Sequence, residues 1–111
     1  MTLVERIEEF GSVAFLVSVG EDGAPHTVSV AVIQSGDDLL AAAGGRTSAN
    51  VAERPDVTLL WPARPGEPYS LIVDGHAELR GERVAIRPAR AVLHRLAHAD
   101  PGLPSCVRLL S

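Results

Sequence analysis

The 111-residue sequence contains no lysine. All ten basic residues are arginines, and fourteen carboxylates give a formal net charge of −4 and a pI of about 5.5. Because nucleic acids are bound through positively charged surfaces, this balance argues against a nucleic-acid partner. No apolar run approaches the ~20 residues of a membrane span, and the first residues lack the basic flank and apolar stretch of a signal peptide. We therefore expect a cytoplasmic protein without a membrane partner.

Cysteine and aromatic residues are also scarce. The single cysteine, Cys106, excludes an internal disulfide and a Cys-rich zinc site, and it is typical of a reducing compartment. Only 4% of the residues are aromatic, so a core must be built mainly from Val, Leu and Ala. With 46% hydrophobic and 22% charged residues, the composition is that of one folded globular domain.

The chain begins with a helix signal. Thr2 and Glu5 have the spacing of a capping box, apolar residues follow at helical spacing, and Gly11 then stops the pattern. These signals predict a short helix over Leu3–Phe10.

Two-residue alternation, separated by turn residues, predicts six short antiparallel strands. They cover Val13–Val19, His26–Ile33, Leu39–Ala43, Val57–Trp61, Tyr69–Arg80 and a segment beginning at Arg83. A helix of two turns over Ser48–Arg54 precedes Pro55. Six strands with one internal helix indicate a small closed antiparallel barrel.

The segment after Pro88 has two interpretations. Its apolar residues have helical spacing and alanine-rich helix propensity, which predicts a helix over residues 89–97. A strand that continues past a bulge at the proline is the alternative. The residues from Asp100 to Ser111, which include two prolines and a glycine, are interpreted as a loose tail.

The segment Gly44–Asn50 carries most of the recognisable chemistry. Two glycines permit close approach of a ligand to the backbone, and Thr47 or Ser48 can cap the following helix. Arg46 offers a guanidinium group that can donate two parallel hydrogen bonds to phosphate oxygens. One interpretation is an anion site at a helix N-terminus. The other is an ordinary loop with a capped helix and a solvated arginine, because short motifs match by chance.

The histidines indicate no metal site. His94 and His98 have the spacing of two metal ligands only if their segment is helical, and no glutamate or second thiol accompanies them. His26 and His76 lie on predicted strands and are interpreted as rim or surface side chains. The sequence contains no nucleophile elbow, P-loop or dinucleotide fingerprint, so no catalytic residue is predicted.

Three blocks of the sequence occur in an order that is shared with a known family. The first block is similar to a first strand, at Val13–Val19, followed by an Asp-Gly-x-Pro-His turn, at Glu21–His26. The second is similar to a phosphate-binding turn, a helix and a fourth strand, at Arg46–Leu60. The third is similar to a strand with an x-Gly-x-Ala signature, at Tyr69–Glu78. Over about Val13–Arg95 the chain resembles the pyridoxamine 5′-phosphate oxidase-like, FMN-binding split-barrel family. Agreement of the three blocks with the independent strand pattern strengthens the resemblance.

The resemblance implies a mainly β, six-stranded antiparallel split barrel over residues 13–95. The N-terminal helix then lies within residues 1–12, a second short helix lies between strands 3 and 4, and residues 96–111 form a tail. It also implies that the last strand runs from Arg83 to His94, against the helical interpretation. Because family members are usually homodimers with flavin bound between the subunits, a homodimer is expected.

The resemblance also implies residues for the cofactor. In the resembled family an arginine and a lysine, adjacent in the sequence, bind the flavin phosphate. By position, Arg46 matches that arginine and Thr47 matches that lysine, although threonine carries no charge. Ser48 and Asn50 are expected to supplement Arg46. The second strand is expected beside the isoalloxazine ring, mainly through its backbone, at Thr27, Val28, Ser29 and Val30.

The expected function is therefore that of an FMN- or deazaflavin-dependent oxidoreductase acting on an unidentified small molecule. In such proteins the cofactor carries the hydride and the protein positions the substrate. The segment that recognises substrate in pyridoxamine phosphate oxidases has no match here. The alternative is a non-catalytic flavin- or haem-binding module of the same fold. The uncharged Thr47 favours the module, and Gly44–Thr47 as a whole favours the enzyme.

Overall fold

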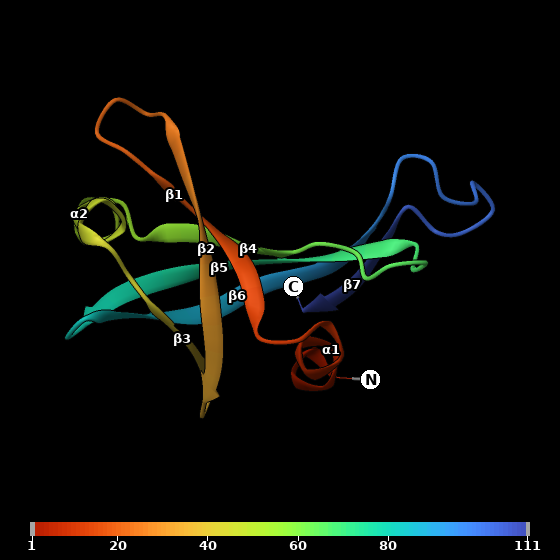
Figure 1. The fold of residues 1–111 in the computed structure, drawn as a ribbon, viewed down its shortest axis with the longest axis horizontal. Coiled ribbons are helices and arrows are strands. Elements are labelled where there is room, and N and C mark those ends of the chain that lie inside the picture. The colour runs from red at the N-terminus through yellow and green to blue at the C-terminus, as the bar shows by residue number, and fades with distance from the viewer. Residues whose placement is uncertain (1, 111) are drawn as a thin grey trace.

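The computed structural model describes residues 2–110 as a mainly β protein with two short helices (Figure 1). The elements are α1 (Leu3–Phe10), β1 (Val13–Val19), β2 (Pro25–Ser35), β3 (Asp38–Ala42), α2 (Gly45–Glu53), β4 (Asp56–Trp61), β5 (Tyr69–Arg80), β6 (Arg83–Arg95) and β7 (Cys106–Leu110). The capping box of Thr2 and Glu5 is present, and Gly11 ends α1 with a φ of +98°. The predicted first helix is confirmed.

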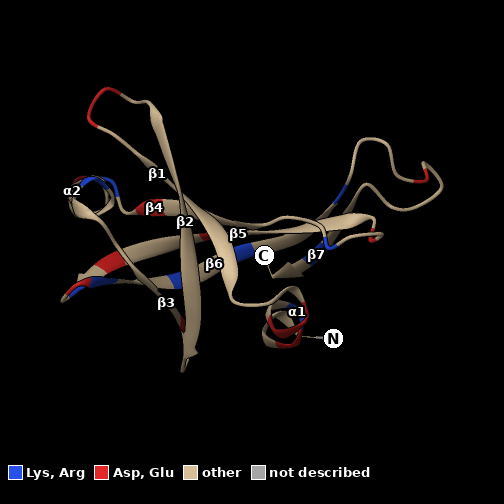
Figure 2. Ribbon diagram, in the orientation of Figure 1, with Lys and Arg blue, Asp and Glu red and all other residues tan. Residues whose placement is uncertain are grey.

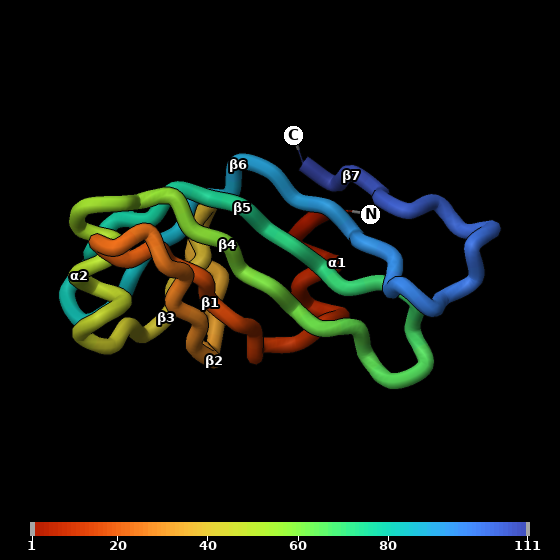
Figure 3. Tube along the Cα trace, turned by 90° about the horizontal axis from the view of Figure 1, so that it is seen from above, coloured from red at the N-terminus to blue at the C-terminus, as the bar shows by residue number. Residues whose placement is uncertain are grey.

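Strands β1 to β6 form a closed antiparallel barrel, which confirms the predicted fold class. The neighbour order is β3-β2-β1-β4-β5-β6, and β3 also pairs with the first residues of β6, so the sheet returns on itself. Strands β5 and β6 run together along the length of the molecule, and β7 lies at the outer edge of β6 (Figure 3).

Strand β6 decides between the two interpretations of the segment after Pro88. It is a strand of 13 residues, so the helix predicted over residues 89–97 is wrong and the strand implied by the family resemblance is confirmed. Its register with β5 shifts between Asp74 and Gly75, where Pro88 faces the glycine. A bulge accommodates the proline because proline cannot donate a ladder hydrogen bond. A Cβ at Gly75 would lie 2.7 Å from the carbonyl oxygen of Arg87, which explains the glycine.

The C-terminal segment contains a strand that the sequence did not predict. The tail expected over residues 100–111 includes β7, which pairs antiparallel with the second half of β6; Ser111 lies outside the described residues. The first half of β6 pairs with β3, and the second half would otherwise present an open edge. Val107 and Leu109 pack against the core, so β7 also buries apolar surface.

Helix α2 begins earlier than predicted. Its N-cap is Gly44, no side chain caps it, and the Ser48 amide donates to the Gly44 carbonyl at 2.9 Å. The prediction that Thr47 or Ser48 caps this helix is therefore wrong, because both residues lie inside its first turns. Within residues 2–110 neither helix is long and apolar enough to cross a membrane.

The core lies inside the barrel and consists mostly of small aliphatic side chains. Its largest member, Trp61, is 1% exposed, and its Nε1–H donates to the carbonyl oxygen of Gly11 at 2.9 Å. This bond ties the end of β4 to the end of α1, whose Ile7 is also buried. The remaining members include Leu16, Leu59, Leu71, Val73, Val84, Ile86 and Leu93.

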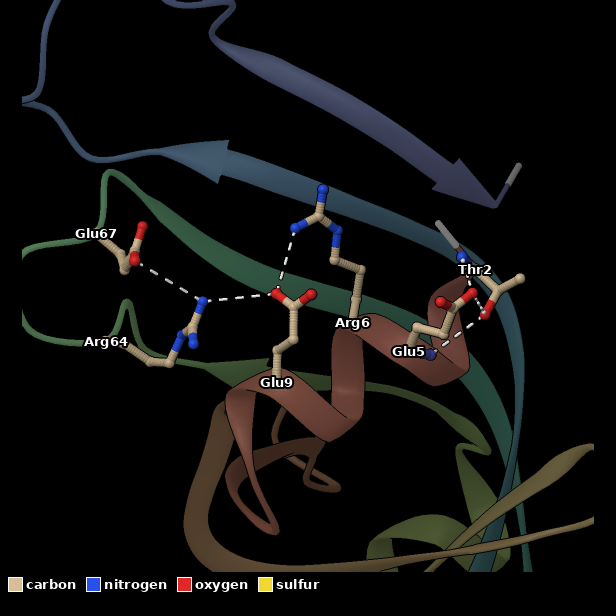
Figure 4. Close-up of polar contacts among 6 residues, drawn as sticks. All are labelled: Thr2, Glu5, Arg6, Glu9, Arg64 and Glu67. Atoms are coloured by element: carbon tan, nitrogen blue, oxygen red, sulfur yellow. Dashed lines mark hydrogen bonds and ion pairs between the residues drawn. The ribbon is translucent and has the colours of Figure 1, made fainter.

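Polar contacts attach the outer side of α1 to the loop between β4 and β5 (Figure 4). Glu9 lies 3.5 Å from Arg6 and 3.6 Å from Arg64, and Arg64 lies 4.0 Å from Glu67. The Arg64 guanidinium also lies 5.5 Å from the centre of the Phe10 ring. Exposed ion pairs each contribute less than about 1 kcal/mol, so these contacts orient a helix whose position depends on buried apolar residues.

Candidate functional site

A cavity of about 670 Å³ lies where the turn between β1 and β2 meets the start of α2. The two segments lie side by side, and charges of both signs occur on them (Figure 2). The lining residues are Gly20, Glu21, Asp22, Ala24, Pro25, His26, Arg46 and Asn50. The turn contributes the carboxylates, and the helix contributes the guanidinium and the amide.

The turn is held by its own hydrogen bonds. The Gly20 amide donates to the Ala24 carbonyl at 2.9 Å, and the Gly23 amide donates to the Gly20 carbonyl at 2.9 Å. The Ala24 amide donates to Oδ1 of Asp22 at 3.0 Å. Gly23 has a φ of +80°, which only glycine adopts readily. This wall of the cavity is therefore defined by local geometry.

The first turn of α2 has no side-chain cap, and one of its residues, Arg46, lines the cavity. The N-cap residue Gly44 makes no side-chain cap, so the first backbone N–H groups of the helix have no side-chain acceptor there. A Cβ added at Gly44 or Gly45 would meet no atom within 4 Å. Arg46 is exposed and lines the cavity, and no ion pair joins it to a carboxylate among residues 2–110. This donor set fits a single phosphate-like anion.

Asn50 is held in place by a buried hydrogen bond. Its Nδ2 donates to Oγ of Ser18 at 3.0 Å, and the two side chains are 5% and 0% exposed. At the other end of α2, Nε of Arg54 donates to the Val19 carbonyl at 2.8 Å. Both bonds attach α2 to the end of β1, so the position of Arg46 relative to the turn is determined by tertiary contacts.

Comparison with known proteins begins with the sequence. No protein-family model matches it. Two uncharacterised proteins, from Mycobacterium bovis and Mycobacterium tuberculosis, are each 38% identical over 104 residues, which covers 78% of this chain and 73% of each relative. The chain belongs to their family.

Solved structures of similar fold identify the architecture. A putative pyridoxamine 5′-phosphate oxidase from Listeria innocua has a TM-score of 0.66 at 21% identity and covers 81% of this chain and 94% of its own. An F420 reductase has a TM-score of 0.60 at 17% identity, and the match covers 71% of this chain and 87% of the reductase. The haem storage protein HutZ from Vibrio cholerae has a TM-score of 0.58 at 14% identity, and the match covers 79% of this chain and 89% of HutZ. The protein has the split-barrel fold of pyridoxamine 5′-phosphate oxidase-like proteins. The predicted resemblance is confirmed.

The split barrel brings two of the residues predicted for the cofactor to the cavity, Arg46 and Asn50. Thr47 is only 1% exposed, so its hydroxyl cannot take the place of a phosphate-binding lysine, and it can offer only its backbone N–H. Ser48 is half-buried and does not line the cavity. The expectation that both hydroxyls face a ligand is not supported, because the helix starts before them.

The four residues predicted on the second strand divide between two faces. Val28 and Val30 pack against the core, whereas Thr27 and Ser29 are exposed on the outer face of β2. Alternation along a strand makes this division unavoidable. Of the four, Thr27 and Ser29 are the residues with exposed side chains.

Sequence reasoning missed His26 as a member of the cavity. The side chain is half-buried and lines the cavity together with Arg46 and Asn50. The alternation of β2 was a usable signal, because it places His26 on the same face of the strand as the inward-facing Val28. What the sequence could not show was that α2 lies next to that end of the strand.

Outside the cavity, the Asp38 carboxylate is paired with two arginines. Asp38 accepts hydrogen bonds from Nε of Arg87 at 2.8 Å and Nη2 of Arg80 at 3.2 Å, which joins the β2–β3 turn to the β5–β6 hairpin. The hydrogen bond from Arg87, with a smaller contribution from Arg80, lowers the pKa of the Asp38 carboxyl below its usual value. This pairing lies where β3 and β6 close the barrel.

No group of three His, Cys, Asp or Glu residues in the described part of the chain is arranged to hold a metal ion. His94 lies on β6, and His98 lies in the loop that follows, so the helical spacing on which a pair of ligands would depend does not exist.

Proposed function

We propose that this split barrel is a flavin-binding oxidoreductase that holds FMN, or a deazaflavin, by a phosphate group in the cavity between the β1–β2 turn and α2. The observation that carries the proposal is that Arg46, which has no carboxylate partner among residues 2–110, lines the cavity from the first turn of a helix without a side-chain cap. Guanidinium groups and helix N-termini both favour phosphate oxygens. Structural neighbours described as an F420 reductase and a putative pyridoxamine 5′-phosphate oxidase support it.

A bound flavin would supply the hydride transfer, and this chain would supply binding and orientation. Arg46 and the first N–H groups of α2 would hold the phosphate. The carboxylates of Glu21 and Asp22, on the facing turn, are acceptors suited to hydroxyl groups of the chain that links phosphate and ring. No residue of the described chain is assigned as a general acid or base.

A homodimer is part of the proposal. On the outer face of the barrel, Phe15 lies opposite Leu60, and Leu60 lies opposite Ile72, so apolar side chains form a row across three strands. Phe15 is 39% exposed, and adjacent exposed apolar side chains mark interaction surfaces. Thr27 and Ser29 lie beside this row on β2, opposite residues of β1. A second copy on this face would enclose a flavin ring next to them.

Binding of haem without turnover is the second candidate. It is favoured by the imidazole of His26 in the same cavity, because imidazole is a common iron ligand. The haem storage protein from Vibrio cholerae shares the fold. The absorption spectrum distinguishes the candidates, since haem gives a Soret band and flavin does not.

A cytoplasmic location completes the proposal. Its support is the free, exposed thiol of Cys106, which suits a reducing compartment. Fractionation of the native host should place the protein in the cytoplasmic fraction, and recovery from the membrane or the medium would contradict this part.

The experiment that tests the proposal is a titration of the purified protein with FMN, riboflavin, F420 and haemin. We expect FMN or F420 to bind, and Arg46→Ala to weaken binding of the phosphate-bearing flavin by about tenfold to a hundredfold without affecting riboflavin. Arg83→Ala, which removes an exposed arginine elsewhere, is the matched control. If neither flavin binds more tightly than ~100 µM, about −5.5 kcal/mol, the proposed function is wrong. Unchanged FMN affinity in Arg46→Ala would remove Arg46 from the site.

The dimer is tested separately by sedimentation. We expect a dimer at micromolar concentration and a monomer with weakened flavin binding for Phe15→Glu, because a charge would be buried at the interface. Leu79→Glu, at another exposed apolar position, should leave the dimer intact. A wild-type protein that sediments only as a monomer would contradict an intersubunit flavin site.

A further inference from the structure

The Asp-Gly-x-Pro-His turn ends in a histidine that the proposed function does not use. The hydrogen bonds of the turn determine where β2 begins, and Pro25 pairs with Val19 as its first residue. His26 is therefore the first residue of β2 with a side chain that can ionise. Its position relative to β1 follows from the register of the two strands.

The register places His26 beside the buried contact between β1 and α2. His26 lies directly opposite Ser18, whose Oγ accepts the hydrogen bond from Asn50. Side chains of directly opposed residues in an antiparallel pair lie on the same face, with Cβ atoms about 4.5–5.5 Å apart. The imidazole is therefore on the same side of the sheet as Ser18 and Asn50, and it lines the cavity with Arg46.

The ring of His26 differs from that of His76. The ring of His76 is oriented by a carboxylate, since its Nδ1 lies 3.2 Å from Oδ1 of Asp56. Among residues 2–110, no hydrogen bond or ion pair joins the ring of His26 to another side chain. Both ring nitrogens of His26 therefore remain available to a ligand in the cavity.

The charged groups around the cavity have unequal responses to pH. Arg46 on α2 and Arg54, which is bonded to the Val19 carbonyl, keep their charge at every relevant pH. Glu21 and Asp22, on the facing turn, contribute carboxylates to the same cavity. Histidine is the side chain that normally changes its charge between about pH 5 and 8. His26 contributes a side chain of this type to the cavity.

We propose that His26 is the second cationic ligand of the phosphate group held at Arg46, in the role that an uncharged, buried Thr47 cannot perform. The inference rests on the proposed function and goes beyond it, because it makes binding of phosphate-bearing flavins dependent on pH. Protonated imidazole attracts phosphate and neutral imidazole does not, so the contribution weakens as the pH rises. The phosphate itself loses charge below about pH 6, which acts in the opposite direction. The effect of His26 is therefore measured against a variant rather than from the wild-type profile alone.

The test compares FMN and riboflavin affinity at pH 6 and pH 8 in the wild type and three variants. His26→Gln should weaken FMN binding about tenfold at pH 6 and by less than about twofold at pH 8, with riboflavin unchanged. His26→Lys, which keeps a positive charge, should bind FMN well at both pH values. His76→Gln is the control for loss of a strand histidine outside the cavity and should behave as the wild type.

A second measurement is independent of how well the variants fold. Inorganic phosphate is added to the wild-type protein, and the imidazole C–H resonances are followed by NMR, with His26→Gln used to assign the signal. The His26 resonances should shift at pH 6 and not at pH 8, whereas those of His76 should remain in place.

The outcomes separate the two proposals. If the wild type binds FMN and His26→Gln binds it equally well at pH 6, the role of His26 is overturned and the flavin proposal stands. If no flavin binds at either pH, both are overturned. A Soret band that forms with haemin and disappears in His26→Gln would assign the imidazole to iron instead of phosphate and would overturn the inference.

Discussion

The two helices meet the barrel in opposite ways. Helix α1 buries the apolar Ile7, and the carbonyl oxygen of Gly11 at its end accepts a hydrogen bond from the largest buried side chain, Trp61. On its outer side Arg6 pairs with Glu9, and Glu9 also lies 3.6 Å from Arg64 of the β4–β5 loop (Figure 4). This end of the molecule is therefore held by apolar burial, the hydrogen bond from Trp61 and surface ion pairs.

At α2 the buried groups are largely polar, and Arg46 and Glu53 form no ion pair with any residue from 2 to 110. Ser18, Thr47 and Asn50 are nearly inaccessible to solvent, while Arg46 and His26 face an open cavity. Burial of polar groups contributes less to stability than burial of apolar surface, and it requires hydrogen bonds to be made. The contrast indicates that the α1 end stabilises the fold, whereas the α2 end, which lines the cavity, contributes less to stability.

Among the variants that test this contrast, Trp61→Ala should have the largest effect on the free energy of unfolding. We expect it to lower the free energy of unfolding by roughly 3–5 kcal/mol, because a large buried side chain and its hydrogen bond to α1 are both lost. Urea denaturation followed by circular dichroism measures the change. Leu79→Ala, at a partly exposed position, should cost less than about 1 kcal/mol. A cost for Trp61→Ala as small as that of Leu79→Ala would show that the α1 end is not the stabilising one.

Asn50→Ala should have an intermediate effect at the other end. Removal of the amide leaves Ser18 buried without its donor, and we expect a loss of about 1–3 kcal/mol in unfolding free energy. Ser18→Ala and the double variant complete a cycle. If the hydrogen bond accounts for the effect, the double variant costs less than the sum of the single ones. Strict additivity would mean that Asn50 acts through other contacts.

Asp38→Asn should have a smaller effect on stability, and the effect should depend on pH in the acidic range. Because hydrogen bonds from Arg87 and Arg80 lower the pKa of Asp38 in the folded state, its contribution to stability is present above the ordinary carboxyl pKa and lost as the pH falls through the lowered one. Below about pH 4 the wild type should therefore lose stability more steeply than Asp38→Asn. Denaturation at pH 7 and pH 3 measures the difference. Asp37→Asn is the neighbouring control, and a profile for Asp38→Asn like that of the wild type would contradict the prediction.

Arg46→Ala should have the smallest effect on stability. The side chain is exposed and without an ion-pair partner among the described residues, so the free energy of unfolding should change by no more than about 0.5 kcal/mol. Flavin affinity, in contrast, should fall as stated above. A variant that loses several kcal/mol would show that Arg46 is part of the structure, and the contrast between the two helices would no longer hold.

Local signals in the sequence were sufficient for most of the fold. The capping box at Thr2 and Glu5, together with Gly11, predicted the bounds of α1 as the structure has them. Alternation and turn residues predicted β1 and β5 with the observed bounds. These features are readable because a helix cap, a hairpin turn and a two-residue period each depend on residues that are close together in the sequence.

The sequence was misleading where a distant partner decides the local structure. Apolar residues after Pro88 have helical spacing, yet the segment is a strand because β5 and β7 supply hydrogen bonds on its two sides. The five residues of β7 lie in a segment rich in turn residues, and only the open edge of β6 makes them a strand.

By itself the sequence determined the class of fold, the order of the elements and the choice of Arg46 as a candidate ligand. Only the tertiary structure decided that Thr47 is buried, that Val28 and Val30 pack in the core, and that His26 shares a cavity with Arg46. The physical reason is that the periodicity of a strand or helix determines the face on which each side chain lies. Closure of the barrel and strand register determine what lies opposite that face.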